Sequence, residues 1–376
     1  MDARIGRFSP GQCRRLVIKI GSSLLIDPAG EVRRGWLDGV IADVAERRAA
    51  GQEIVIVSSG SIALGARRLG LPKGGRANLE DAQAAAATGQ ILLSGCYAEL
   101  LGARGLTAAQ MLVTLDDLED RRRFLNASAT LDRLLGLGVV PVLNENDSVA
   151  TAEIRFGDND RLAARAAQAA NAGGVILLSD IDGLYTANPQ HDPEARLVET
   201  VTRLDERVIA MGDARSASGL GSGGMVSKLQ AAKIATHAGA HLAIITGKVE
   251  RPLSVFAETG RGTVFIAPPA RRAKKAWLAG RLTVKGAVHI DAGAAQALAR
   301  GKSLLAAGAT RVDGAFRRGD PVDIIAPDGH AIARGLIEYD AADATRIAGQ
   351  RSDAHEGILG YTPRAALIHR DHMVML

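Results

Sequence analysis

The first 266 residues alternate between short aliphatic runs and longer stretches with helical periodicity, and this alternation limits the fold more than any other feature. Runs typical of strands occur at 16–20, 54–57, 106–113, 139–143, 175–178 and 242–246, and helices are expected between them, including one over 81–101. Strands separated by helices pair in parallel through crossovers, and the helices cover both faces of the sheet. The alternation therefore predicts an α/β fold with a parallel sheet.

After residue 277 the pattern changes to short alternating runs at 282–288, 322–325 and 332–338, with one helix near 291–300. This pattern indicates a small β-rich, barrel-like module. Residues 270–376 carry 16 Lys and Arg against 11 Asp and Glu, which supplies the whole net charge of +5. The pair Pro268 and Pro269 breaks regular structure at the same place. We therefore expect one domain over 1–267, a linker over 268–277 and a second domain over 278–376.

Composition excludes several classes of protein. Apolar residues make up 47% of the chain and charged residues 23%, which excludes wholesale disorder. Two cysteines, Cys13 and Cys96, are too few for a disulfide scaffold or a cysteine-based zinc site. The N-terminal segment has no apolar signal core, and no run of 18 apolar residues occurs. We expect a cytoplasmic protein with no membrane association.

Residues suited to phosphate follow the first predicted strand. Lys19 lies in an otherwise apolar run, where an ammonium group is costly unless it reaches an anion. Gly21, Ser22 and Ser23 follow, and their backbone amides can face a phosphate. A lysine at a sheet edge that reaches water is the alternative interpretation, but the adjoining Gly-Ser-Ser favours a phosphate site.

Four further polar clusters follow predicted strands or turns: 58–61 (SSGS), 144–147 (NEND), 157–160 (GDND) and 179–180 (SD). Ligands of parallel α/β sheets bind at the carboxyl ends of the strands, which is where three of these clusters lie. Asn and Asp side chains can bind an ammonium group, and an aspartate can orient catalytic lysines. Helix capping is the alternative interpretation of 58–61, and Asx turns and helix caps are the alternative interpretation of 144–147 and 157–160.

A glycine-rich loop at 218–228 (SGLGSGGMVSK) enters a predicted helix. Glycines let the backbone approach a phosphate closely, a helix N-terminus favours anions, and Lys228 adds a positive charge. The sequence contains no nucleophile paired with a base and no zinc-type spacing of His and Glu. These features favour phosphoryl transfer, which chiefly needs positioning and charge neutralisation.

In order and spacing, the motifs resemble those of the glutamate 5-kinases of the amino-acid kinase superfamily. The motifs are 19–23 (KIGSS), 57–60 (VSSG), 144–147 (NEND), 157–160 (GDND), 182–186 (DGLYT) and 221–228 (GSGGMVSK). Residues 346–349 (RIAG) and 358–361 (ILGY) resemble the PUA domain that many bacterial members carry. The family's fold implies an αβα sandwich with a mainly parallel central sheet, followed by the small β-rich PUA-like domain.

The resemblance implies ATP-dependent phosphorylation of the side-chain carboxylate of L-glutamate, the first step of proline biosynthesis. Lys19 and Lys228 would stabilise the transferring phosphoryl group, and Asp160 would hold the two lysines in place. The glutamate-binding residues that it implies are Ser59, Gly60, Asn144, Asp147 and Asn159. The implied ATP-binding residues are Lys19, Gly21, Ser179, Asp180, Ser222, Gly223, Gly224, Met225, Val226, Ser227 and Lys228.

The resemblance also implies Mg²⁺ held through the ATP phosphates without direct protein ligands, feedback inhibition by proline, and a homo-oligomer. Two alternatives stay open. One is a kinase for another small carboxylate. The other is an RNA-binding protein with a vestigial kinase domain, which the basic C-terminal segment supports. We further expect the Lys228 side chain to face solvent in the empty site, so that its removal costs little stability.

Overall fold

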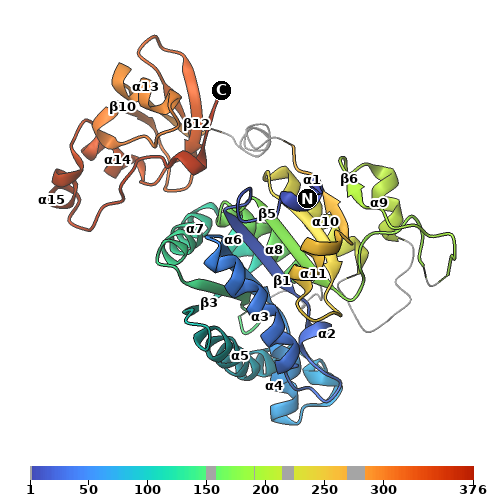
Figure 1. Cartoon of the computed structure of the whole chain (residues 1–376). Coiled ribbons are helices and arrows are strands. Elements are labelled where there is room, and N and C mark those ends of the chain that lie inside the picture. The colour runs from blue at the N-terminus through green and yellow to red at the C-terminus, as the bar shows by residue number, and fades with distance from the viewer. Residues whose placement is uncertain (1, 150–157, 190, 214–223, 269–283) are drawn as a thin grey trace. The chain divides into compact units, whose positions relative to one another are not determined.

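The structure, a computed structural model, describes residues 2–149, 158–189, 191–213, 224–268 and 284–376 (Figure 1). The chain divides into two compact units, one formed by Met1–Glu119 with Ala127–Pro268 and the other by Asp120–Asn126 with Pro269–Leu376. Apart from Pro268, the expected linker over 268–277 lies outside the described residues.

The first unit is built on a sheet that has eight strands in the described part of the chain, in the order β3-β4-β2-β1-β5-β7-β8-β6. All neighbouring strands are parallel except β7 and β8, which confirms the prediction of a mainly parallel sheet. Strands β6 and β8 were not predicted from the sequence, because they are too short to show a pattern. The strands are β1 (Arg15–Ile20), β2 (Glu53–Ser58), β3 (Ala108–Val113), β4 (Val140–Glu145), β5 (Gly174–Ser179), β6 (Thr200–Val201), β7 (His241–Thr246) and β8 (Thr263–Phe265).

Helices cover both faces of this sheet, as an αβα sandwich requires (Figure 1). One face packs against α3 (Arg34–Ala49), α5 (Leu79–Gly102) and α11 (Pro252–Thr259). The opposite face packs against α8 (Asp158–Ala169) and α10 (Met225–His237). The other helices that the structure describes in this unit are α1 (Ala3–Gly6), α2 (Ser22–Leu25), α4 (Ser61–Leu69), η1 (Pro72–Gly75), α6 (Leu115–Glu119) and α9 (Glu206–Asp213). Helix α7 (Arg121–Gly136) begins in the second unit and belongs to this one from Ala127 onward.

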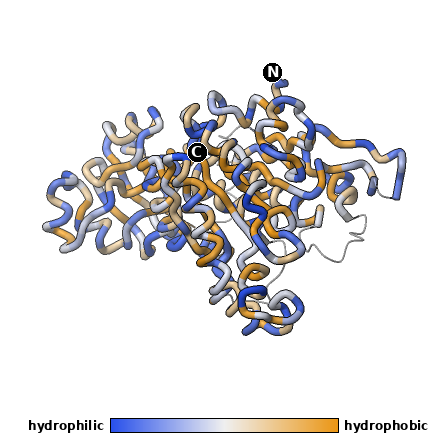
Figure 2. The backbone as a smooth tube through the Cα atoms, turned by 60° about the horizontal axis from the view of Figure 1, so that its bottom comes forward, coloured by the Kyte–Doolittle hydropathy of each residue, from blue (hydrophilic) through white to orange (hydrophobic). Residues whose placement is uncertain are grey.

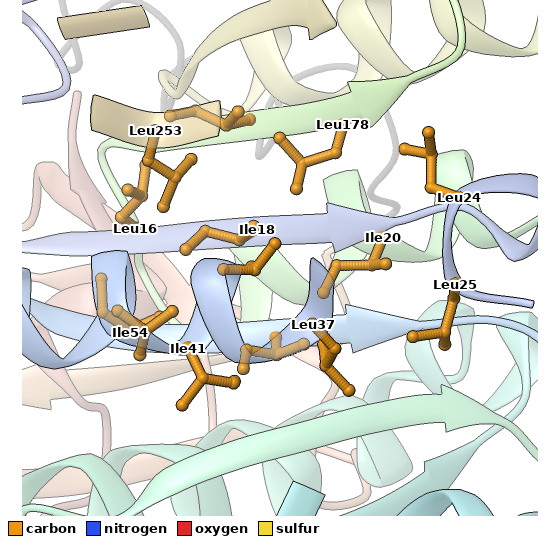
Figure 3. Packing of buried hydrophobic residues seen from close by; sticks show 14 of the residues in the cluster. Leu16, Ile18, Ile20, Leu24, Leu25, Leu37, Ile41, Ile54, Leu178 and Leu253 are labelled. Carbon is orange, nitrogen blue, oxygen red and sulfur yellow. The ribbon is translucent and has the colours of Figure 1, made fainter. Parts of the chain in front are cut away.

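Strand β1 shows how the sequence sets the core. Leu16, Ile18 and Ile20 alternate along the strand and lie in one apolar cluster with Leu37 and Ile41 of α3 (Figure 3). All five side chains are fully buried, and burial of each contributes about 1.5–3 kcal/mol. Within the unit, hydrophobic stretches of the backbone run mainly through the interior and hydrophilic stretches lie in outer loops (Figure 2). Because side chains alternate along a strand, Lys19 points to the opposite face, towards α8 and α10.

The second unit has its own sheet, with five strands in the described residues and the order β10-β9-β11-β12-β13. Strands β9 and β11 pair in parallel and the other neighbours are antiparallel. The strands are β9 (Gly286–Ile290), β10 (Ala309–Gly314), β11 (Pro321–Ile325), β12 (Ala331–Leu336) and β13 (Met373–Met375). The helices are α13 (Ala292–Ala299), η2 (Ala306–Gly308), α14 (Ala341–Ile347), η3 (Ser352–Ala354), α15 (His355–Leu359) and η4 (Arg370–His372).

A separate hydrophobic cluster fills the second unit, as expected for an independent domain. The sequence predicted β9, β11, β12 and α13 within a few residues, but it missed β10 and β13. Among the helices that the structure describes, none is both long enough and apolar enough to cross a membrane.

Candidate active site

Parallel pairing brings the carboxyl ends of β1, β2, β4 and β5 to one edge of the sheet. In the register of the strands, Ile20 lies opposite Ser58, and Ser179 lies opposite Thr246. Gly21 follows β1 directly and is the N-cap of α2. The polar clusters that the sequence placed after these strands therefore share this edge.

Two lysines and one aspartate form a buried charged triad on the α8 side of the sheet. Lys19 Nζ lies 2.6 Å from Asp160 Oδ1, and Lys228 Nζ donates a hydrogen bond of 3.1 Å to Asp160 Oδ2. Asp160 is fully buried, and Lys19 and Lys228 are only 7% and 6% exposed. Three elements thus converge, since Lys19 comes from β1, Asp160 from α8 and Lys228 from α10.

Burial by itself raises the pKa of Asp160, but the charges of Lys19 and Lys228 outweigh it and leave this pKa below its ordinary value. Asp160 is therefore a carboxylate at neutral pH that can hold both ammonium groups. The expectation that Lys228 faces solvent is wrong, because the side chain is drawn inward by the carboxylate of Asp160.

Asn159 is the centre of a cluster of amides and hydroxyls beside the triad. Its Nδ2 group donates to Ser59 Oγ at 2.7 Å, to the main-chain oxygen of Ser58 at 3.1 Å and to Asn144 Oδ1 at 3.3 Å. Its Oδ1 atom is buried and, among the residues that the structure describes, has no hydrogen-bond partner. A buried oxygen without a donor is costly, and a bound ammonium group is the kind of ligand that would satisfy it.

The turn after β2 presents Ser59 to this cluster. Gly60 has a φ of 107°, a conformation that favours glycine, and it is the N-cap of α4 without any side-chain capping bond. Ser58 is buried and shares a hydrogen bond of 2.9 Å with Tyr97 OH, so its role is structural. Ser61 Oγ accepts a bond of 3.3 Å from Asn144 Nδ2. The serines of this turn are thus used for purposes other than helix capping.

Asp147 lies just beyond β4 and is 9% exposed. Burial lowers the pKa of Arg76, and the nearby carboxylate of Asp147 opposes that shift. Sequence reasoning missed Arg76. Lys73, Gly74 and Gly75, in the turn before Arg76, all have positive φ in the structure. Nothing in the sequence connects that turn to β4, so no local signal identified Arg76.

A cavity of about 460 Å³ opens beyond the ends of β5 and β7. Its lining combines polar groups with apolar side chains, including Asp180, Ile181, Thr246, Lys248, Val249 and Phe256. Ser179 Oγ donates a hydrogen bond of 3.1 Å to Asp180 Oδ1, which fixes the predicted pair at the rim. The sequence did not point to the residues after β7 or on α11. A mixed apolar and polar cavity of this size suits a nucleobase and ribose.

The glycine-rich loop is described only from Gly224 onward, so the predicted Ser222 and Gly223 lie outside the described residues. Gly224 is the N-cap of α10, and as a glycine it provides no capping side chain of its own. The first turn, with Met225, Val226 and Ser227, therefore offers its backbone amides next to Lys228. This arrangement suits a phosphate group.

Comparisons with known proteins agree with the geometry. A family model described as "Amino acid kinase family" matches residues 14–247, and one described as "PUA domain" matches residues 286–359. The glutamate 5-kinase of Sphingopyxis alaskensis is 66% identical over 98% of this chain and 99% of its own length. Those of Zymomonas mobilis and Novosphingobium aromaticivorans are 63% and 59% identical over 98% and 97% of this chain, and 93% and 96% of their own lengths.

The chain therefore belongs to the amino acid kinase family and, within it, to the glutamate 5-kinases. The resemblance drawn from its motifs is confirmed, and so is the presence of a PUA domain.

Proposed function

We propose that this chain transfers the γ-phosphoryl group of ATP to the side-chain carboxylate of L-glutamate, giving L-glutamyl 5-phosphate, the first step of proline biosynthesis. The observation that carries the proposal is the buried Lys19–Asp160–Lys228 triad, placed between the Asn159 cluster and the helix N-terminus of α10. High identity to glutamate 5-kinases over nearly the whole chain supports the same reaction.

The two ammonium groups supply what phosphoryl transfer needs. The nucleophile is a carboxylate that is already an anion, so the reaction requires no general base. We assign Lys19 and Lys228 to neutralising charge on the transferring phosphoryl group and Asp160 to holding both lysines in place. Asp160 is a positioning residue, since its two oxygens face the lysines.

We assign glutamate to the cluster around Asn159. The unpartnered Oδ1 of Asn159 supports an acceptor role towards the α-ammonium group, and the carboxylate of Asp147 carries the charge suited to the same group. Ser59, Gly60 and Asn144 complete the proposed set, with Ser59 and Asn144 bonded directly to Asn159.

We assign ATP to the cavity beyond β5 and β7, with its phosphates directed towards Gly21, the start of α10 and the triad. Ser179 and Asp180 lie at that cavity or its rim. The roles of Ser222 and Gly223 stay predictions. We propose that Mg²⁺ enters with ATP and is held through the ATP phosphates without direct protein ligands. In the described residues no group of three or more His, Cys, Asp or Glu side chains is placed to hold a metal ion.

For the rest of the molecule we keep the expectations drawn from the resemblance: a homo-oligomer, inhibition by proline and a cytoplasmic location. We also keep the proposed domains, 1–267 for the kinase and 278–376 for the PUA domain, joined by 268–277. For the PUA domain we favour a regulatory or assembly role over RNA binding.

A trapping assay tests the reaction. The purified chain is incubated with Mg-ATP, hydroxylamine and one acid at a time: glutamate, aspartate or N-acetylglutamate. Both hydroxamate and ADP are measured. An acyl phosphate reacts to give the hydroxamate, so we expect signal with glutamate alone. A signal with another acid would show that the substrate is that acid and not glutamate. Absence of any signal from folded protein would contradict the kinase function.

A further inference from the structure

Helices α4 and α5 cross very closely beside the cluster around Asn159, and two glycines make this crossing possible. A Cβ atom at Gly89 of α5 would lie 1.8 Å from the main-chain oxygen of Ser61, and one at Gly65 of α4 would lie 1.8 Å from the main-chain oxygen of Ala85. The two helices are therefore in backbone contact. This contact brings the next residue of α5, Gln90, within reach of Asn144.

The amide of Gln90 has a defined polarity. Ser94 Oγ donates its one hydrogen to the main-chain oxygen of Gln90, so towards the Gln90 side chain it can only accept. Gln90 Nε2 faces that hydroxyl at 3.4 Å. Gln90 Oε1 consequently faces the other way and accepts a bond of 2.7 Å from Asn144 Nδ2.

The same polarity continues to the site. With its Nδ2 facing Gln90, Asn144 directs its Oδ1 towards the Nδ2 group of Asn159, 3.3 Å away, and the main-chain amide of Glu145 supports this orientation at 2.9 Å. With its own Nδ2 occupied, Asn159 leaves Oδ1 as a buried acceptor that has no partner in the described part of the chain. Along the series Ser94, Gln90, Asn144 and Asn159, each side chain thus fixes the orientation of the next amide. The series ends at the Asn159 oxygen, which is left to accept a hydrogen bond from the ligand.

We propose that Gln90 is a positioning residue for substrate specificity: it orients Asn144 and, through it, the Asn159 oxygen that accepts the α-ammonium group of glutamate. The proposal rests on the proposed function. In this proposal Gln90 does not contact glutamate itself. The proposal also connects the close Gly65–Gly89 crossing to the site, because Gln90 directly follows Gly89 and accepts the bond from Asn144.

The test replaces Gln90 by Met, which keeps an unbranched chain but offers no oxygen, and by Glu, which keeps an acceptor for Asn144. Ile91→Ala, at an exposed position of the same helix, is the matched control. The measurements are kcat, the KM values for glutamate and ATP, and the inhibition constant of glutarate competing with glutamate. Glutarate lacks the α-ammonium group, so its binding does not depend on the Asn159 oxygen.

For Gln90→Met we expect the glutamate KM to rise about tenfold, with kcat, the ATP KM and the glutarate inhibition constant changed less than about twofold. Gln90→Glu should preserve the ratio of the glutarate constant to the glutamate KM, and Ile91→Ala should change nothing. If Gln90→Met does not fold, Ser94→Ala takes its place. The Ser94→Ala change lets the Gln90 amide rotate by 180°, and it should lower the ratio of the glutarate inhibition constant to the glutamate KM about threefold.

A ratio unchanged in folded Gln90→Met or Ser94→Ala would overturn the proposal, because a residue that only shapes the pocket affects glutamate and glutarate alike. A wild-type chain that binds glutarate as well as glutamate would also overturn it. Failure of the wild-type chain to phosphorylate glutamate would instead contradict the proposed function, so the two failures are distinguishable.

Discussion

Replacement of Asp160 by Asn is the most informative single change. Asn has nearly the same shape as Asp but no charge, so it leaves the packing intact and removes only the negative charge between Lys19 and Lys228. Both ammonium groups then stay buried, 7% and 6% exposed, against a side chain that cannot neutralise them.

The expected loss of stability follows from that burial. Removing one partner from a buried ion pair costs about 3–5 kcal/mol, since a charge is left uncompensated. Domains are stable by roughly 5–15 kcal/mol, so the variant should still fold. For a unit of this size about 2–4 °C of Tm corresponds to each kcal/mol, which predicts a Tm lower by roughly 6–20 °C.

The assay is thermal unfolding with and without a nonhydrolysable ATP analogue, together with the hydroxamate assay. The analogue's phosphates replace the missing charge, so it should raise the Tm of Asp160→Asn more than that of the wild-type chain. The kcat should fall about 100-fold, because the two lysines lose their fixed position. Asp132→Asn is the matched control, since Asp132 pairs with Arg15 with 59% of its side chain exposed and should contribute less than about 1 kcal/mol.

A Tm within about 2 °C of the wild-type value would refute the reasoning, because two buried ammonium groups cannot lose their shared carboxylate without cost. An unchanged kcat in the folded variant would refute the positioning role of Asp160.

Four further predictions concern other parts of the kinase unit. Lys228→Met should lower kcat at least about 100-fold and also lower the Tm by several degrees, because the side chain is buried against Asp160; hydroxamate formation and calorimetry measure both, and activity near the wild-type level would remove Lys228 from the mechanism. Asp147→Ala should raise the glutamate KM about tenfold or more and the ATP KM less than about twofold, whereas an effect on ATP alone would move Asp147 to the nucleotide site. Gly89→Ala should lower the free energy of unfolding by about 3 kcal/mol in urea titrations, because its Cβ would lie 1.8 Å from the Ser61 oxygen; Gly95→Ala, with nothing within 4 Å, is the control on the same helix, and equal stabilities would argue against the close crossing. Burial and the charge of Arg7 lower the pKa of His241 to about 4, so between about pH 6.5 and 4 the unfolded chain binds more protons than the folded one, and stability decreases as the pH is lowered through this range. After a discount for partial exposure, His241 should lower the free energy of unfolding by about 1–2 kcal/mol between pH 7 and 5. A His241→Gln variant whose stability has the same pH dependence as the wild-type chain would contradict the lowered pKa of His241.

The sequence determined the sheet and the edge at which the chemistry occurs. Buried strands such as β2 and β5 appear as continuous apolar runs because helices cover both of their faces, and that pattern is local. Polar residues that follow such runs, including Ser59 and Asp147, necessarily gather where parallel strands end. The alternation of side chains along β1 also determined that Lys19 faces away from Leu16, Ile18 and Ile20.

Only the tertiary structure decided which distant residues complete the site. The resemblance already paired Lys228 with Asp160, 68 positions earlier, but the burial of Lys228 was missed because it depends on how closely α10 packs against α8. Arg76 and Gln90 carried no local signal, since a turn and the middle of an Ala-rich helix resemble many others. The physical reason is the same in each case: local patterns record burial, whereas these contacts depend on how closely whole helices approach, as α4 and α5 do at their two glycines.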